Sequence, residues 1–584
     1  FRGNETHHTE VCDAPSVEPQ QNIEDELSNK VFEITKKLEN LTTKTCANVL
    51  LKQQINNLKT LVSQQQCTIK TLKRRTSKQQ RKICNLKDVV SSLRKKINYY
   101  ENNSVDVNKF QENTELLSRM WAKINNKPLP NQYGPEIRKF AVTTHFYSPK
   151  AFSFIRKQFM DCLPHPKTLS VWYSSVNGAP GFTSEAFDVL KAKAEERKIV
   201  CSLVFDEVAI KRCIEYDGQQ YYGYADMGSI IEVNENEEAK EALVFMLVAI
   251  NGSWKIPVGY FLSHSLNSEQ KLGLLKQCLF LVKSVGIEIS NITFDGCATN
   301  LSMASALGCS FSPSNLKTNF GEENILLLLD PSHMMKLIRN TFGDKRRIVD
   351  GENNVIDFKY LELLNELQEN EGLHLANKLR RRHINFFKQK MKVALATQLL
   401  SRSVCEALTF CRDILQLDQF KNCGATATFI LNINDAFDIL NSRRIKEFGY
   451  KQALNKYNIN QVKTFVNCFT SYISKLRFFN KDLIIHSPRK TGFIGFVAGL
   501  HAVLNIYEQY VVGDGGTSIL QYLPTYKCSQ DHLENFFFQI RNLGGCNNNP
   551  TTRQFKSAYK KLLIHAEINH SGFGNCVPLE QVNI

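Results

Sequence analysis

Residues 202–207 of this chain read SLVFDE, a short apolar run that ends in an acid at Asp206. The same pattern returns in NITFDG, which carries Asp295, and in ILLLLDPSH, which carries Asp330. Short apolar runs rich in β-branched and aromatic residues are typical of buried strands. The three runs therefore predict a sheet that delivers carboxylates to its strand tips, where they gather in one acidic site.

A further acidic motif lies far downstream, where SQDHLENFFFQIR places Asp531 and Glu534 three residues apart. This spacing puts both side chains on the same face of a helix. Carboxylates without a neighbouring histidine or thiol cluster prefer Mg²⁺ or Mn²⁺. Two such ions close together commonly support in-line displacement at a phosphodiester, so the acids indicate chemistry on nucleic acid. For any single acid an alternative stays open, because aspartates at strand ends are often caps or turn residues.

The composition favours a polyanionic partner. The 584 residues include 73 Lys and Arg against 57 Asp and Glu, a net charge of +16. Phosphate contacts dominate nucleic-acid affinity, although a merely basic soluble protein is the alternative. The basic run KRRTSKQQRK at residues 73–82 suits nuclear import or DNA-backbone contact, or else a solvated helix face. No apolar run approaches the roughly 18 residues that span a bilayer, so we expect no membrane partner.

The N-terminal third is predicted to be helical after a polar start. Residues 1–26 are polar and aperiodic, which is typical of disorder. Residues 27–102 carry heptad-spaced apolar residues, regular from Ile55 to Ile97, which predict a coiled coil for homo-oligomerisation rather than a solvated single helix. Residues 103–185 combine short helical patterns with a tight turn, which suits a helix-turn-helix-like DNA-binding module or a purely structural one.

The remaining chain predicts an α/β fold. Residues 186–340 show consecutive strands followed by β-α-β alternation, which indicates a mixed sheet flanked by helices. The first acid falls on the first strand and the second on the fourth, which is the ribonuclease H-like order. Residues 341–525 are mostly helical and form a large insertion in this catalytic domain. The domain resumes over residues 526–584 with the helix that carries Glu534.

Several ordered motifs resemble the P-element transposase family, which includes THAP-domain transposases. They are FDE, FDG with TN, DPSHMMKLIRN, KVALATQLLS, NDAFDILNS and SQDHLENFFFQIRNLGG with NPTTRQFK, and they span about residues 103–572. The resemblance implies a nuclear cut-and-paste DNA transposase that cleaves and joins double-stranded transposon ends. Asp206, Asp295 and Glu534 become its catalytic acids and the ligands of Mg²⁺ or Mn²⁺. The zinc ligands of the THAP domain are absent here, so we expect this domain to be truncated or lost.

The resemblance also implies GTP as a cofactor bound by the helical insertion, although the chain has no P-loop motif. Asp438 would accept two hydrogen bonds from the guanine edge. The positions that match the family's nucleotide site are Lys378, Lys392, Val393, Ser401, Asp438 and Asn441.

Two further residues and two other functions stay open at this point. Asp330 is either an additional metal-site acid or a helix cap, and His333 either contacts DNA or metal-bound water or is structural. The chain could instead be a domesticated, catalytically silent DNA-binding protein. A third hypothesis is a protein in which GTP controls assembly without chemistry. The presence of all three catalytic acids favours the transposase.

Overall fold

The computed structural model divides the chain into two units, Phe1–Glu112 and Asn113–Ile584. The predicted disordered segment and the predicted coiled coil lie in the first unit and, apart from residues 29–30, outside the described residues, so both stay predictions. The fold described below is that of the second unit. The structure describes residues 29–30, 114–174, 177–228, 237–318, 324–372, 375–513, 518–543 and 547–570.

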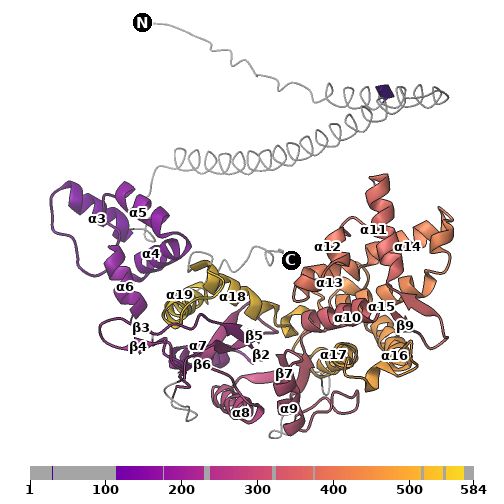
Figure 1. Ribbon diagram of the computed structural model, residues 1–584. Coiled ribbons are helices and arrows are strands. Elements are labelled where there is room, and N and C mark those ends of the chain that lie inside the picture. The colour runs from indigo at the N-terminus through magenta and orange to yellow at the C-terminus, as the bar shows by residue number, and fades with distance from the viewer. Residues whose placement is uncertain are drawn as a thin grey trace. The chain divides into compact units, whose positions relative to one another are not determined.

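A six-stranded sheet with the order β1-β6-β5-β2-β7-β8 forms the centre of this unit (Figure 1). β2 pairs with β5 in antiparallel and with β7 in parallel orientation, and β8 continues the parallel side. This is the mixed sheet of the ribonuclease H-like fold that the sequence predicts. Its strands are β1 Gly181–Phe182, β2 Val200–Ala209, β5 Glu241–Ala249, β6 Lys255–Ser263, β7 Glu288–Phe294 and β8 Leu326–Leu329.

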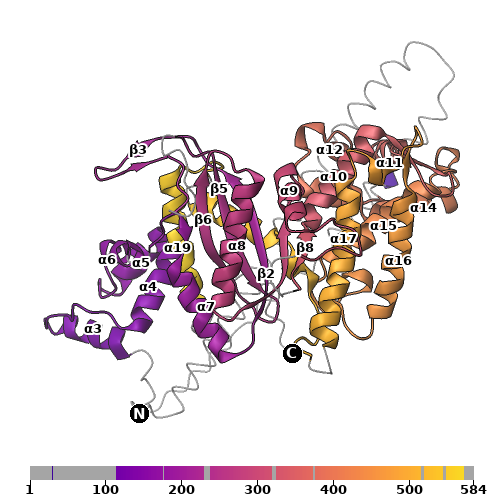
Figure 2. The same ribbon diagram turned by 90° about the horizontal axis from the view of Figure 1, so that it is seen from below.

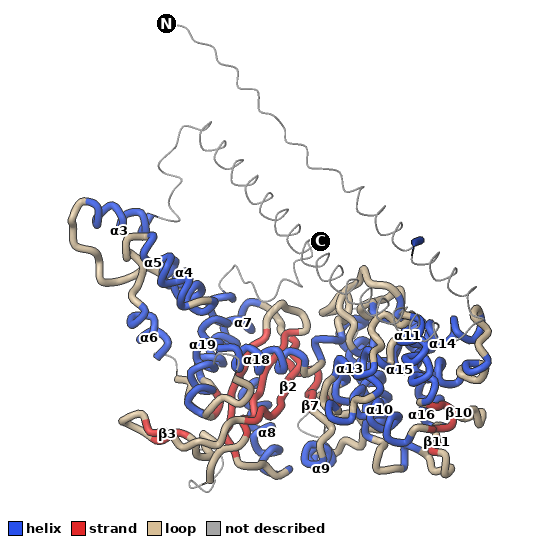
Figure 3. The backbone as a smooth tube through the Cα atoms, turned by 45° about the horizontal axis from the view of Figure 1, so that its top comes forward, coloured by secondary structure: helices blue, strands red, loops and turns tan. Residues whose placement is uncertain are grey.

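β5 and β6 are apolar along most of their length because helices cover the sheet. β5 and β6 are buried at every residue except the first. α7 (Ser184–Glu196) and α19 (Thr552–His570) pack against β6, and α18 (Asp531–Leu543) packs against β2 (Figure 3). Burial on both faces removes the alternation of apolar and polar residues, so these strands read as continuous hydrophobic runs.

A helical module precedes the sheet. The predicted turn at Ser148 is present, because its side chain caps α5 by accepting a hydrogen bond from the backbone of Ala151. α19 packs against α4 and α6, so the last described helix joins this module to the sheet. β1 falls within the range 103–185 predicted for the module but belongs to the sheet, because it pairs with β6. The prediction missed this strand because two residues are too few to form a sequence pattern. The module helices are α3 Thr114–Ile124, α4 Pro135–Tyr147, α5 Pro149–Gln158 and α6 Pro166–Ser174.

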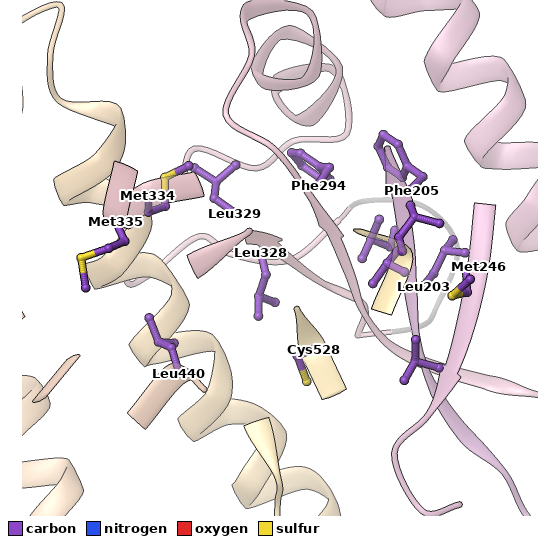
Figure 4. Packing of buried hydrophobic residues seen from close by; sticks show 14 of the residues in the cluster. Leu203, Phe205, Met246, Phe294, Leu328, Leu329, Met334, Met335, Leu440 and Cys528 are labelled. Carbon is purple, nitrogen blue, oxygen red and sulfur yellow. The ribbon is translucent and has the colours of Figure 1, made fainter. Parts of the chain in front are cut away.

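The insertion is mostly helical, as predicted, and packs beside β8. α17 contacts both β8 and α10 (Figure 2), and Gly495 permits this approach because a Cβ there would clash with Met334. In Figure 4, Met334 lies beside Leu329 of β8. A small sheet that was absent from the prediction has the order β10-β9-β11. Its strands are β9 Arg347–Val349, β10 Val355–Asp357 and β11 Arg477–Phe478.

The main helices of the insertion are α10 Pro331–Lys345, α11 Lys359–Glu371, α12 Arg381–Ile384, α13 Val393–Leu399, α14 Arg402–Asp413, α15 Gly424–Leu440, α16 Ile459–Lys475 and α17 Thr491–Tyr507. Within the described ranges, no helix combines the length and the hydrophobicity that crossing a membrane requires.

Candidate active site

The pairing of β2 with β7 sets Asp206 and Asp295 level with each other. The ladder ends with Val204 opposite Thr293. One residue further, the rings of Phe205 and Phe294 stack with centroids 5.4 Å apart. Both side chains are labelled in Figure 4. Each phenylalanine is followed directly by an acid, Asp206 in one case and Asp295 in the other. Two distant apolar runs therefore place their carboxylates at the same edge of the sheet.

Asp206 does not lie at a strand tip, which corrects the sequence prediction. β2 continues to Ala209, and Asp206 itself pairs with Val244 of β5. The strand extends past the acid because β5 still supplies hydrogen-bond partners after β7 has ended at Phe294. Asp295, in contrast, directly follows its strand, as predicted.

The charge of Asp206 is influenced by the other predicted acids. Burial raises the pKa of Asp206 well above its usual value; the nearby His333 opposes this, while Asp295, Glu207 and Glu534 reinforce it. A cation would relieve the repulsion among these carboxylates. Even so, no three or more His, Cys, Asp or Glu side chains in the described part of the chain form a ready-made metal cage.

Glu534 is exposed in the first turn of α18. Gln530, the residue before this helix, holds the helix against the sheet. The backbone N–H of Gln530 donates to Asp330 Oδ1 at 2.9 Å, and its side-chain Nε2 donates to the carbonyl of Phe205 at 2.6 Å. At the first residue of the helix, Asp531 accepts a hydrogen bond from Ser332 at 3.1 Å. α18 is thus joined to β2 at Phe205, next to Asp206, and to Asp330, the residue directly after β8.

Asp330 has the geometry of a helix cap. Its side chain is 1 % exposed and accepts from the backbone N–H of His333 at 2.8 Å, which caps α10. The same oxygen lies 3.0 Å from His333 Nδ1, while the other accepts from Gln530. Burial tends to raise the pKa of Asp330, but these hydrogen bonds and His333 lower it below its usual value. Of the two roles left open by the sequence, the capping arrangement is present.

His333 faces two of the acids. Burial lowers the pKa of its imidazole, but the hydrogen bond and charge of Asp330, assisted by Asp206, shift it to a net higher value. Lys336 lies one turn along α10 and is buried, so its pKa is lowered although Asp330, Glu534, Asp206 and Asp295 act in the opposite direction. Lys336 could not be singled out from the sequence, since a lysine in a helix is ordinarily a surface residue.

The hydrogen bonds that hold Asp295 also involve residues missed from the sequence. Asn300 Nδ2 donates to Asp295 Oδ1 at 2.7 Å, and the backbone N–H of Cys297 donates to the same oxygen at 3.1 Å. Asn300 in turn accepts from Lys271, a buried lysine of α8 (Ser268–Ser284). Only the letters TN in the family motif hinted at Asn300, and no signal pointed to the position of Lys271.

In the insertion, some of the predicted nucleotide residues come together. Asn434 bridges α14 and α15: it accepts from the backbone of Arg402 at 3.1 Å and donates to Asp438 at 3.0 Å. Ser401, the residue directly before α14, therefore lies near Asp438. Burial raises the pKa of Asp438, opposed mainly by Lys451. One turn on, Asn441 Oδ1 is buried without a hydrogen-bond partner in the described residues.

The predicted phosphate-binding residues are placed differently. Lys378 is exposed in a turn before α12, and Lys392 is exposed as the cap residue of α13, whose first residue is Val393. Across the described ranges, no hydrogen bond or ion pair joins either lysine to Asp438. The structure thus brings Ser401 close to Asp438, while Lys378 and Lys392 are solvent-exposed.

Comparison with family models matches four successive segments. They are the TNP-like RNase H N-terminal domain over residues 178–308, the TNP-like GTP-binding insertion domain over 332–453, the TNP-like RNase H C-terminal domain over 526–560, and the transposable element P transposase-like HTH domain over 20–172. Asp206 and Asp295 fall within the N-terminal RNase H segment and Glu534 within the C-terminal one, with the insertion between them, which agrees with an interrupted catalytic domain.

Two curated proteins are similar to this chain. DNA transposase THAP9 of Homo sapiens is 29% identical over 466 residues, which cover 78% of this chain and 51% of that protein. The Transposable element P transposase of Drosophila melanogaster is 25% identical over 449 residues, covering 73% and 53%. The chain spans about half the length of these relatives.

A solved structure shares the fold. The Drosophila P element transposase strand transfer complex aligns with a TM-score of 0.63 at 22% identity, covering 79% of this chain and 98% of that one. The likeness extends over both the sheet and the helical insertion, since such coverage exceeds either part alone.

Proposed function

The chain belongs to the P-element transposase family, and on that premise we propose that it cleaves transposon ends and joins them to a target DNA. It carries ribonuclease H-like domains and a GTP-binding insertion domain, which define a DNA transposase in outline. The proposal goes further by assigning the chemistry to Asp206, Asp295 and Glu534 and by placing the protein in the nucleus.

One observation carries the assignment. The β2–β7 register sets Asp206 and Asp295 level, and Gln530 and Asp330 hold the helix of Glu534 against the same edge. The three carboxylates offer only hard oxygen donors, and burial, with a smaller contribution from the neighbouring acids, raises the pKa of Asp206, so they fit a divalent cation of the Mg²⁺ or Mn²⁺ type. Such ions, when bound, activate the attacking oxygen and stabilise the leaving one.

The contribution of this chain's own residues is to position the acids. Asp295 is oriented by two donors on Oδ1, and Asp206 accepts at 3.0 Å from the backbone N–H of Glu207. Neither carboxylate is free to rotate fully, so the site is partly preorganised before any ligand arrives. Preorganised charges lower a barrier more effectively than charges that must first be turned into place.

For the insertion we propose guanine recognition by Asp438, with Asn441 beside it. A carboxylate accepts from the two adjacent N–H groups of the guanine edge, whereas adenine presents a different pattern. The buried, unpartnered Asn441 Oδ1 is a second acceptor that a donor of the base would satisfy. Lys378 and Lys392 would contact the phosphates of the nucleotide, and Val393 and Ser401 would lie near it. GTP would act as an assembly cofactor for an oligomer held by the predicted coiled coil.

The test is strand transfer in vitro with purified protein, GTP, Mg²⁺ and DNA ends taken from the sequence flanking its own gene. Asp295→Ala should give no products and bind DNA nearly as well as the wild type. Asp188→Ala, an exposed acid on α7, serves as the matched control and should retain the activity. Equal products with Asp295→Ala would refute the site. If the wild type and all variants give no products but still bind DNA, the result would favour the hypothesis of a domesticated DNA-binding protein.

A further inference from the structure

Lys271 is buried near the N-terminus of α8, a position that is unfavourable for a lysine. It is 4 % exposed and lies in the first turn and a half of α8, which begins after a capping box formed by Asn267 and Gln270. A positive charge near a helix N-terminus opposes the helix dipole, and burial of an ammonium group is costly unless partners satisfy it. Local rules broken in this way commonly mark a functional requirement.

The partners of Lys271 connect the two strands that carry the proposed catalytic aspartates. Its Nζ forms an ion pair with Glu207, the residue after Asp206 in β2. It also donates to Asn300 Oδ1 at 2.9 Å and to Thr299 Oγ1 at 3.1 Å, both in α9 (Ala298–Ala306), which follows β7. These three acceptors match the three donors of an ammonium group.

The interaction with Asn300 reaches Asp295 itself. Because the amide oxygen of Asn300 accepts from Lys271, its nitrogen is turned to donate to Asp295 Oδ1 at 2.7 Å. The backbone N–H of Cys297 donates to the same Oδ1. In the part of the chain that the structure describes, no protein donor contacts Oδ2. One carboxylate oxygen is therefore fixed, and the other is left available to a ligand.

Lys271 also balances charge beside the site. Burial raises the pKa of Glu207, and Asp295 and Glu241 act in the same direction, while the charge and hydrogen bond of Lys271 oppose them. Without the lysine, a buried acid next to Asp206 would have no cationic partner and would add to the repulsion among the carboxylates. With it, Glu207 is engaged and does not compete with Asp206 and Asp295 for a cation.

We propose that Lys271 and Asn300 are positioning residues that orient the carboxylate of Asp295 and thereby set the affinity of the acidic site for a divalent cation. The inference rests on the proposed function, because it assumes that Asp206 and Asp295 hold the metal. Lys271 acts only through Asn300 and Glu207 and does not contact the reacting groups. Outer hydrogen bonds of this kind typically change metal affinity by about 10–100-fold.

The experiment measures Mn²⁺ binding to the purified protein, without DNA, by the loss of the free-ion electron paramagnetic resonance signal. We expect Lys271→Met and Asn300→Ala each to raise the Mn²⁺ Kd about tenfold or more. Adding Lys271→Met to Asn300→Ala should raise the Kd by a smaller factor than Lys271→Met does alone, because the route through the asparagine is already lost and only the route through Glu207 remains. Lys276→Met, an exposed lysine of the same helix, is the matched control and should bind as the wild type does.

A second variant protects the test against misfolding. Glu207→Gln with Lys271→Met removes both buried charges, so it should melt close to the wild type in circular dichroism and still bind Mn²⁺ weakly. Wild-type affinity in this folded double variant and in Asn300→Ala would overturn the inference. If the wild type itself binds no Mn²⁺, or if Asp295→Ala leaves its binding unchanged, then the proposed metal site fails, which is a distinguishable result.

Discussion

Replacement of Asp330 by alanine tests how the candidate site is held together. The change removes the acceptor that caps α10 and the acceptor for the backbone N–H of Gln530. Both oxygens are buried, so water cannot replace them without rearrangement. The reasoning predicts a loss of stability and, separately, a displacement of α18 and Glu534 from the end of β2.

The magnitude follows from the two lost interactions. A helix cap contributes about 1 kcal/mol. A buried N–H without an acceptor costs about 1–3 kcal/mol, so Asp330→Ala should lower the free energy of unfolding by roughly 2–4 kcal/mol. Asp330→Asn keeps one acceptor oxygen and can preserve either the cap or the bond to Gln530, so its loss should be about half as large.

The assay pairs urea unfolding, followed by circular dichroism, with Mn²⁺ binding and strand transfer on the folded variants. We expect the order wild type, Asn variant, Ala variant in stability, and Mn²⁺ binding by the Asn variant close to that of the wild type. An Ala variant as stable as the wild type would refute the capping argument. An Asn variant that is fully stable but neither binds Mn²⁺ nor transfers strands would make Asp330 a metal ligand instead.

Two further predictions concern the insertion and the pH dependence of stability. Asp438→Asn replaces one acceptor by a donor, so it should weaken GTP binding by about tenfold or more and reduce the preference over ATP; equal GTP affinity in a titration would contradict the assignment. Burial lowers the pKa of His532 to about 3, aided by Lys255 and Lys527. In the unfolded chain this imidazole becomes protonated below about pH 6.5, whereas in the folded protein it stays neutral. The unfolded state therefore binds more protons in this range, and the free energy of unfolding decreases as the pH is lowered. From pH 7.5 to 5.5 the wild type should lose about 1.3 kcal/mol more than His532→Gln, and equal pH slopes in urea titrations would exclude the effect.

The sequence determined the broad architecture of this protein. Apolar runs such as residues 202–207 can be recognised locally because burial on both faces of a sheet demands continuous hydrophobicity. The order of strands and helices then indicated the mixed sheet and the interrupting helices, which the structure and the family models confirm. The ordered motifs further indicated the family, which the family models and the similar proteins confirm.

The tertiary structure alone decided how the acids are supported. That Asp206 lies inside β2 follows from the extent of β5, which β2 itself does not encode. The hydrogen bond between Asp330 and Gln530 joins residues 200 positions apart, and the burial of Lys271 depends on partners in two other elements. Local patterns report propensity and burial, whereas hydrogen bonds between distant segments arise only when the chain packs, so these supporting residues could not be found from the sequence.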